Sequence, residues 1–276
     1  MAVVLEPAPR LERSETLEAV EATTRLIPSV SVIMPAFNEE GNIAQCVGNV
    51  SASLERMGNP FEIIVIDDGS TDNTRAEALG ARNNPHVKVV GYGQNRGKGF
   101  AIKHGVKYAT GDVVVFRDSD ADVMPGLVGR YVSMLRDCDI AIASKRHPDS
   151  QVKAPLLRKL LSYSFHTLVM LLTGVRVSDT QSGLKAFRRE ALEKIMGLIS
   201  VKHYAYDVEI LTVARLLKMR IVELPVNIEL GGLFSVRSIV RMLVDLVGIT
   251  YRLRVIRWYQ RNLHNSRANY KPIVKW

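Results

Sequence analysis

Three aspartates, Asp118, Asp120 and Asp122, alternate in the segment FRDSDADV (116–123), directly after an apolar run. Carboxylates this close repel one another, and a hard divalent cation such as Mg²⁺ or Mn²⁺ relieves that repulsion. A metal bound there would bridge to a diphosphate and stabilise it as a leaving group. A solvated acidic turn is the alternative. An EF-hand fits less well, because its twelfth position is Gly129 instead of Glu.

Two further segments carry groups suited to a nucleotide or a phosphate. Asp67 and Asp68 follow the apolar run FEIIVI (61–66), and Asp67 could accept hydrogen bonds from a base or ribose. Turn and helix-capping chemistry explains this pair equally well. Lys98 stands between two glycines ahead of a helical pattern, where it could meet a phosphate, and a plain turn is again the alternative. Neither a P-loop nor a hydrolase triad is indicated.

Apolar runs alternate with helical patterns in the first half of the chain, and they must position these groups. The runs are Ser29–Met34, Phe61–Ile66, Val87–Val90, Val113–Phe116 and Ile140–Ala143, with helical patterns at Glu39–Glu55 and Gly99–Thr110. They predict an α/β fold with a mostly parallel sheet flanked by helices. Ligands bind beyond the carboxyl ends of such strands, so the acidic segments should converge on one crevice.

After about residue 150 the pattern is mainly helical. Helices are expected at Leu156–Leu172, Arg189–Ile199 and Asp207–Lys218, then a strand around Ile221–Glu229 and a helix from Val236. No apolar stretch reaches the length of a membrane span, so no transmembrane helix is expected. Cys46 and Cys138 are far apart and fit buried, reduced thiols better than a disulfide.

The net charge of +9 is concentrated in a basic tail. Residues 232–276 hold nine Lys or Arg and one acid, a net +8. In the helix from Val236, arginines line one side and apolar residues the other, which is typical of an amphipathic helix at an interface. Such a tail suggests a polyanionic partner, either an anionic membrane surface or a nucleic acid. No nucleic-acid-binding motif accompanies it, so we do not expect a nucleic acid as partner.

Taken in order, six segments resemble glycosyltransferase family 2, the inverting group with the Rossmann-like GT-A fold. They are VSVIMPAFNEEGNI (30–43), EIIVIDDGSTDNT (62–74), NRGKGFAIKHGVKYATGD (95–112), residues 118–125, VSDTQSGLKAFRREAL (177–192) and YAYDVEIL (204–211). Within the family the chain is similar to the polyprenyl-phosphate sugar synthases, which load a hexose onto dolichyl or another polyprenyl phosphate. The last two segments look more like the glucosyl than the mannosyl branch.

The resemblance implies a role for each matching position. The base and ribose would be held by Pro35, Phe37, Glu39, Val65 and Asp67. The metal and diphosphate would be bound by Asp118 and Asp120, with Ser119 between them, while Asp122 would be a third metal ligand and Lys98 would meet a phosphate. The sugar and acceptor would lie near Arg146, Asp179, Gln181, Lys185 and Asp207. Relatives often carry a lysine in the loop that corresponds to residues 231–235. This chain has none there, and Arg237 could replace it.

The implied reaction is transfer of a hexose, with inversion, from UDP-glucose, or second GDP-mannose, to dolichyl or another polyprenyl phosphate. An anionic phosphate needs little deprotonation, so Arg146 and Lys185 would position it while Asp179 orients the sugar. The expected organisation is a flexible extension (1–28), a GT-A domain (29–232) and a basic, membrane-associating segment (233–276). We expect a peripheral protein on the cytoplasmic face of a membrane.

Two other functions are compatible with the residues. A glycosyltransferase with a hydroxyl acceptor, in polysaccharide or glycolipid synthesis, would need a firm catalytic base. A non-catalytic protein that binds nucleic acid or lipid through the basic tail would leave the acidic cluster unexplained. Loss of activity with EDTA would separate a metal-dependent transferase from a tail-driven binder.

Overall fold

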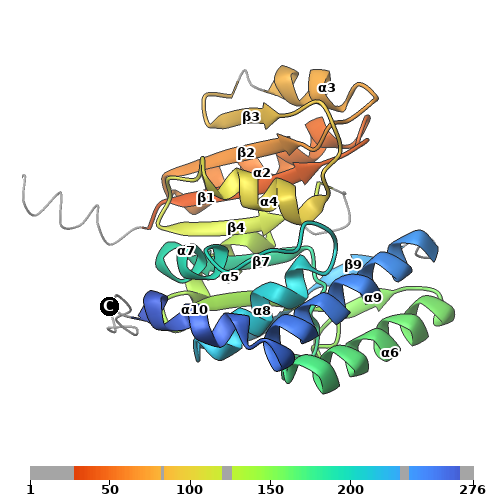
Figure 1. The fold of residues 1–276 in the computed structure, drawn as a ribbon. Coiled ribbons are helices and arrows are strands. Elements are labelled where there is room, and N and C mark those ends of the chain that lie inside the picture. The colour runs from red at the N-terminus through yellow and green to blue at the C-terminus, as the bar shows by residue number, and fades with distance from the viewer. Residues whose placement is uncertain (1–27, 82–83, 120–125, 231–235, 268–276) are drawn as a thin grey trace, which may run out of the picture.

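The computed structural model describes residues 28–81, 84–119, 126–230 and 236–267, and its core is a seven-stranded sheet with helices on both faces (Figure 1). The strands are β1 (Val30–Ala36), β2 (Phe61–Asp67), β3 (Val87–Gly91), β4 (Val113–Arg117), β5 (Ile140–Ser144), β7 (Leu184–Arg188) and β8 (Ile221–Pro225). They lie in the order β3-β2-β1-β4-β7-β5-β8. The predicted α/β fold with a mostly parallel sheet is confirmed.

Strand β7 is a correction to the expectation that helices fill this part of the chain. It lies between β4 and β5 and runs antiparallel to both, whereas β1, β2, β3 and β4 pair in parallel, as do β5 and β8. Its sequence LKAFR contains the buried Lys185, so it lacks the continuous apolar run that marks the other strands. The predicted strand at 221–229 is also two strands, β8 and the separate β9 (Asn227–Glu229).

Helices cover both faces of the sheet, and alternate side chains of each strand pack against the helices on opposite faces. The inner side chains alternate: Val32 and Met34 pack with α2 (Ile43–Met57) and α5 (Leu127–Met134), and Ile33 packs in the other cluster with α4 (Lys98–Val106). The short α3 (Thr74–Gly80) lies on the first side, and α7 (Arg189–Met196) and α8 (Tyr206–Leu216) on the second. Both faces of the strands are therefore dry, which explains their unbroken apolar runs.

A second group of elements comes from the segments that follow β5 and β8 in the chain. The long helix α6 (Leu156–Thr173) lies beside α9 (Val236–Thr250), and β6 (Gln151–Lys153) pairs with β9 in a small two-stranded sheet (Figure 1). After α9 the chain continues as a π-helical turn, η2 (Tyr251–Val255), and as α10 (Trp258–Arg267). Within the described ranges, no helix combines the length and apolarity that a membrane span needs.

The C-terminal helices share a core with the sheet. Leu246, Ile249, Leu253 and Tyr259 are buried in the same cluster as the inner face of α8. The predicted boundary between residues 232 and 233 stays a prediction, but the described part of residues 233–276 packs against the domain before it. The predicted extension, residues 1–28, lies outside the described residues except for Pro28.

Candidate active site

A cavity of about 790 Å³ opens at the edge of the sheet where the parallel strands have their carboxyl ends. Five predicted site residues line it: Lys98, Asp118, Arg146, Gln181 and Asp207. The rest of the wall comes from the segment after β5, from α6, from β9 with the following Leu230, from Ser238 and Met242 of α9, and from Gly183 and Tyr204. Segments that are far apart in the sequence thus meet in one cavity, which has both charged and apolar side chains in its wall.

Asp118 lines the cavity and is paired with Lys98. The Lys98 Nζ lies 2.5 Å from Oδ1 of Asp118, and the Asp118 N–H donates to the Gly183 carbonyl at 3.1 Å. A Cβ at position 183 would lie 2.7 Å from Cγ of Asp118, so only glycine leaves room for this carboxylate. Asp120 and Asp122, the other two predicted metal ligands, lie outside the described residues.

Asp68, to which the sequence analysis gave no role apart from Asp67, holds the loop that precedes Lys98. Its carboxylate accepts four hydrogen bonds, from Tyr92 Oη (2.7 Å), Arg96 N (2.8 Å), Gly97 N (2.9 Å) and Asn95 Nδ2 (3.1 Å). Gly97 has a φ of 95°, and a Cβ there would lie 2.7 Å from the Lys202 carbonyl. Turn residues at 95–97 therefore have a specific task, which is to place the first residue of α4 at the cavity.

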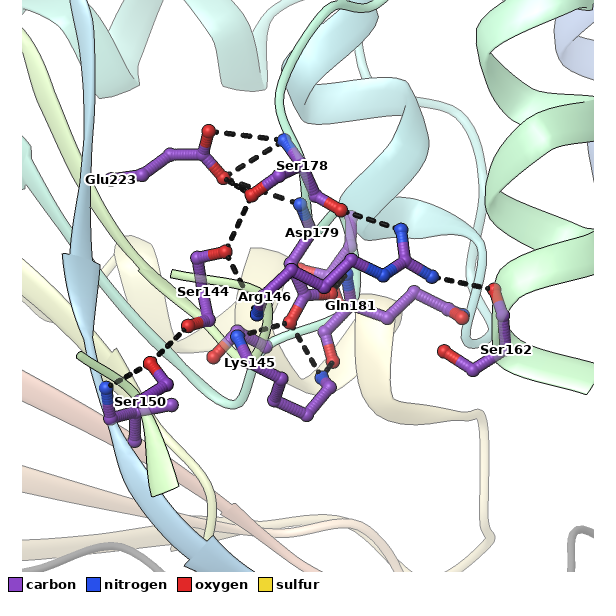
Figure 2. A network of polar contacts seen from close by, with 12 residues as sticks. Ser144, Lys145, Arg146, Ser150, Ser162, Ser178, Asp179, Gln181 and Glu223 are labelled. Carbon is purple, nitrogen blue, oxygen red and sulfur yellow. Dashed lines mark hydrogen bonds and ion pairs between the residues drawn. The ribbon is translucent and has the colours of Figure 1, made fainter. Parts of the chain in front are cut away.

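Asp179 lies behind the cavity wall, held by Lys145. The Lys145 Nζ is 2.9 Å from Oδ2 of Asp179 and donates to the Gln181 carbonyl at 2.8 Å, as Figure 2 shows. Burial alone would raise the pKa of Asp179, but the Lys145 ammonium and the N–H groups of Lys145 and Gln181 outweigh it and hold that pKa below its ordinary value. A carboxylate held ionised in this way is a weak general base.

Arg146 follows Lys145 and lines the cavity with its charge unpaired by any carboxylate among the described residues. Its Nη1 donates to the Ser178 carbonyl at 2.6 Å and its Nη2 to the Ser162 carbonyl at 3.0 Å (Figure 2). The guanidinium lies over the Tyr163 ring, 5.0 Å from its centroid. These neutral acceptors orient Arg146, and the remaining three of its five N–H donors have no hydrogen-bond partner within the described ranges.

Lys185 and Asp207 form a buried pair at the back of the cavity. Nζ of Lys185 lies 2.8 Å from Oδ1 of Asp207, and Lys185 also donates to the Ser182 carbonyl. Burial and the Asp118 carboxylate raise the pKa of Asp207 above its ordinary value, although the charges of Lys185 and Lys98 oppose this. Lys185 is 1% exposed, so its side chain reaches Asp207 instead of the open cavity.

The predicted nucleotide pocket lies at the ends of β1 and β2, beside the cavity. Pro35, Val65, Asp67 and Ser119 are buried, while Phe37 is 42% exposed. Asp67 accepts from the Ser70 N–H at 2.9 Å, and Ser119 Oγ donates to the Pro35 carbonyl at 2.9 Å. The partly buried Glu39 accepts from Asn42 at 3.2 Å, and Val65 packs in the sheet core. Their donor-binding roles stay predictions.

Glu209, in the matching segment 204–211, and Arg237, considered from the sequence, lie away from the cavity. Glu209 turns to the other side of α8, where it accepts from Arg252 at 2.9 Å and from Tyr259, so it joins the C-terminal helices to the domain. Arg237 is exposed in the first turn of α9 and is not part of the cavity wall. The loop 231–235, where relatives often have a lysine, lies outside the described residues.

Lys145, Ser178 and Glu223 are site residues that sequence reasoning missed. Lys145 carried a weak signal, because it directly follows a strand end beside Arg146. Glu223 carried none, because it lies within strand β8, where its carboxylate accepts hydrogen bonds from the Ser178 and Asp179 N–H groups.

Solved structures with the same architecture are GT-A glycosyltransferases. Glucosyl-3-phosphoglycerate synthase from Mycobacterium tuberculosis, in complex with uridine diphosphate, is 22% identical, with a TM-score of 0.64 over 89% of this chain and 85% of that one. Its complex with Mn²⁺, uridine diphosphate and glucosyl-3-phosphoglycerate matches equally well, with a TM-score of 0.64. At this identity the likeness shows the fold, which is GT-A.

The sequence comparison is more specific. The profile of glycosyl transferase family 2 matches residues 31–196, and the chain belongs to that family. It is a glycosyltransferase. Similar proteins include dolichyl-phosphate beta-glucosyltransferases from Saccharomyces cerevisiae, 31% identical over 83% of this chain and 76% of that protein, and from Drosophila melanogaster, 33% identical over 91% and 79%. The human enzyme of that name is 31% identical over 89% of this chain and 82% of its own.

Proposed function

We propose that this chain transfers glucose from UDP-glucose to dolichyl phosphate or another polyprenyl phosphate, with inversion at C1. The observation that carries the proposal is the charge of the cavity. Five basic side chains line it, Lys98, Lys145, Arg146, Arg158 and Lys159, and the carboxylates among its described lining residues are those of Asp118 and Asp207. Such an excess fits two anionic groups together, a donor diphosphate and an acceptor phosphate. The names of the relatives supply the sugar and the lipid.

A phosphate acceptor fits the cavity because the carboxylates of Asp179 and Asp207 are already held by lysines. Asp179 is held ionised by Lys145 and has a lowered pKa, and Asp207, although its pKa is raised, is buried in a pair with Lys185. A hydroxyl acceptor would need its proton removed, whereas a phosphate oxygen attacks as an anion. In the proposed step that oxygen forms a bond to C1 of glucose on the face opposite the leaving group. The bond from C1 to UDP breaks, and UDP departs with the electron pair.

Each side chain then has a task in binding and orientation. Arg146, fixed by the Ser178 and Ser162 carbonyls, points its remaining N–H donors at the acceptor phosphate. Lys98 neutralises the diphosphate from the other side of the cavity, near Asp118. Pro35, Phe37, Glu39, Val65 and Asp67 hold the base and ribose at the ends of β1 and β2.

A divalent cation, Mn²⁺ or Mg²⁺, fits the donor side. Asp118 presents hard carboxylate oxygens to the cavity in the space that Gly183 leaves open. Asp118, Asp120 and Asp122 would hold the ion. Among the described residues, which do not include Asp120 and Asp122, no three potential metal ligands lie together. When bound, the ion would stabilise the negative charge of the leaving diphosphate.

The outer surfaces of two helices support the proposal of a peripheral attachment to a membrane. Exposed apolar side chains, here named the α6–α9 apolar face, are Leu156, Leu157, Leu160, Tyr163, Met170 and Leu171 on α6 and Val236, Val240, Leu243, Val244 and Val247 on α9. Helices α6 and α9 lie side by side (Figure 1). Exposed Lys159, Arg237 and Arg241 accompany this face, which fits anionic headgroups. We place it on the cytoplasmic leaflet, where anionic lipids are enriched.

The test is transfer of labelled hexose to a short polyprenyl phosphate. UDP-glucose and GDP-mannose are offered separately, with Mn²⁺, with Mg²⁺ and with EDTA, and an Asp120→Ala variant serves as the inactive control. We expect metal-dependent label in the lipid product from UDP-glucose alone. Product from GDP-mannose instead would overturn the choice of sugar. Donor hydrolysis without lipid product, rescued by a hydroxyl acceptor, would overturn the choice of acceptor.

A further inference from the structure

Two chains of hydrogen bonds join Glu223 on β8 to Arg146 at the cavity. The first runs through a single peptide unit between Ser178 and Asp179. Its N–H donates to Oε1 of Glu223 at 3.2 Å, and its carbonyl oxygen, that of Ser178, accepts from Arg146 Nη1 at 2.6 Å. In a trans peptide the N–H and C=O point in opposite directions, so a carboxylate at one end aims the carbonyl at the other.

The second chain runs through two serine hydroxyls (Figure 2). Ser178 Oγ donates to Oε1 of Glu223 at 2.6 Å, because a carboxylate only accepts. The Ser144 hydroxyl, 2.7 Å from that of Ser178, is therefore the donor between the two. Ser144 Oγ in turn accepts from the Arg146 backbone N–H at 3.3 Å. The main chain and the side chain of Arg146 are thus tied to the same carboxylate.

Glu223 also binds the Ser178 N–H with both oxygens, at 2.9 and 3.0 Å. Its carboxylate accepts hydrogen bonds from neutral donors only, and it acts on Arg146 only through the peptide and the hydroxyl groups that these bonds polarise. A direct ion pair would have neutralised the guanidinium and drawn it away from the cavity. The arrangement instead fixes Arg146 while its charge stays unpaired by a carboxylate among the described residues.

We propose that Glu223 is a positioning residue for Arg146: it sets the Ser178–Asp179 peptide, and this peptide aims the guanidinium at the acceptor phosphate. The inference rests on the proposed function, in which Arg146 meets that phosphate. Glu223 itself lines no part of the cavity. Its effect should therefore appear in acceptor binding and not in donor binding.

The variant Glu223→Gln keeps the size of the side chain but removes its charge. Its NH₂ group replaces either the oxygen that accepts only from the Ser178 N–H or the one that also accepts from Ser178 Oγ and the Asp179 N–H. We expect the KM for a short polyprenyl phosphate to rise about tenfold, with the KM for UDP-glucose within about twofold of wild type. Glu229→Gln on β9, an exposed carboxylate, is the matched control and should change neither. In an Arg146→Lys background, Glu223→Gln should add little, because both changes act through one guanidinium.

Equal changes in both KM values, or full additivity with Arg146→Lys, would contradict the positioning role. If Glu223→Gln melts below the assay temperature, Ser178→Ala replaces it: this change removes the hydroxyl chain and leaves the peptide chain, and the acceptor KM should rise about threefold. An unchanged acceptor KM in Ser178→Ala would count against the proposal.

A readout without turnover separates this inference from the proposed function. The guanidinium N–H signal of Arg146 in ¹⁵N-arginine-labelled protein, assigned by its absence in Arg146→Lys, should be resolved in wild type and in Glu229→Gln and should broaden or shift in Glu223→Gln. Lack of lipid product from the wild-type chain would sink the proposed function and leave this signal to decide the positioning. An Arg146 signal unaffected by Glu223→Gln would sink the inference even in an active enzyme.

Discussion

The pair between Lys98 and Asp118 joins two predicted motifs that lie twenty residues apart in the sequence. Asp68 holds the turn before Lys98, and Gly183 leaves space beside Asp118. The Lys98 ammonium and the Asp118 carboxylate therefore meet because Asp68 holds the turn before Lys98 and Gly183 has no side chain to displace Asp118. This pair is the part of the site where the donor diphosphate is proposed to lie.

We expect Asp118→Asn to lower kcat/KM for glucose transfer by at least about a hundredfold, because the amide cannot supply the charge that binds a hard cation. The fold should survive, since the Asp118 backbone N–H still donates to Gly183. Transfer assays and a melting curve measure the two effects. Asp149→Asn, an exposed carboxylate outside the cavity lining, is the matched control and should behave as wild type. Activity within about threefold of wild type would remove Asp118 from the site.

At the scale of elements, α6 and α9 each bury one side and leave an apolar side exposed. On α9, Met242, Leu246 and Ile249 face inward, while Val240, Val244 and Val247 are more than half exposed. The inner side explains why the helix is folded, and the outer side has no partner in the described chain. This exposed apolar side is the basis of the proposed membrane attachment, because amphipathic helices with such a side bind in the headgroup region of a bilayer.

We expect the double variant Val240→Ser, Val244→Ser to lose about tenfold or more in partitioning to phosphatidylcholine–phosphatidylserine vesicles. Each exposed valine contributes about 1 kcal/mol when it enters the bilayer, and serine contributes nothing of the kind. Vesicle flotation measures the partitioning, and Leu79→Ser on α3, distant from this face, is the control. Partitioning equal to that of wild type would show that another surface holds the membrane.

Binding to vesicles without phosphatidylserine measures how much the basic side chains contribute to membrane binding. Weaker binding to neutral vesicles, and weaker binding to anionic vesicles at high salt, are expected because the excess charge of residues 232–276 acts through a screened field.

At the scale of the whole molecule, Glu62 joins the strands at one end of the sheet. It lies on β2 and binds Ser31 of β1 at 2.7 Å, Lys88 of β3 at 2.6 Å and the Thr110 backbone at 2.6 Å. Burial alone would raise its pKa, but the hydrogen bonds from Lys88, Ser31 and Thr110 outweigh it and lower the pKa from 4.5 to about 2. The folded state therefore prefers the ionised form.

This preference gives a stability that depends on pH. Because the folded pKa lies below the unfolded one, the contribution of Glu62 is complete above pH 4.5 and is lost as the pH falls toward about 2. We expect Glu62→Gln to lower the free energy of unfolding by about 1–2 kcal/mol near neutral pH, a value reduced because Lys88 is half-exposed. Denaturant unfolding at several pH values measures it. A difference that grows on acidification would contradict this account.

The sequence by itself determined the fold class, the family and the edge of the sheet where the site lies. Apolar runs that end in Asp67 or Asp118 are strands buried on both faces, and their polar ends must meet at one edge, since parallel strands share a direction. Lys98 was found from the glycines on either side of it ahead of a helical pattern, whereas Arg146, Gln181 and Asp207 were found only through the resemblance to the family. The cavity is lined by all four.

Only the tertiary structure decided how these residues work together. Strand β7 was missed because Lys185 interrupts its apolar pattern, and the burial of that lysine is stabilised by Asp207 of α8, 2.8 Å away, and by the Ser182 carbonyl. Glu223 gave no local signal either. Its partners Ser178 and Asp179 lie over forty residues earlier, and β8 brings it to them through pairing with β5. Local patterns record which face of an element is buried, whereas contacts between distant segments arise only when the sheet is assembled.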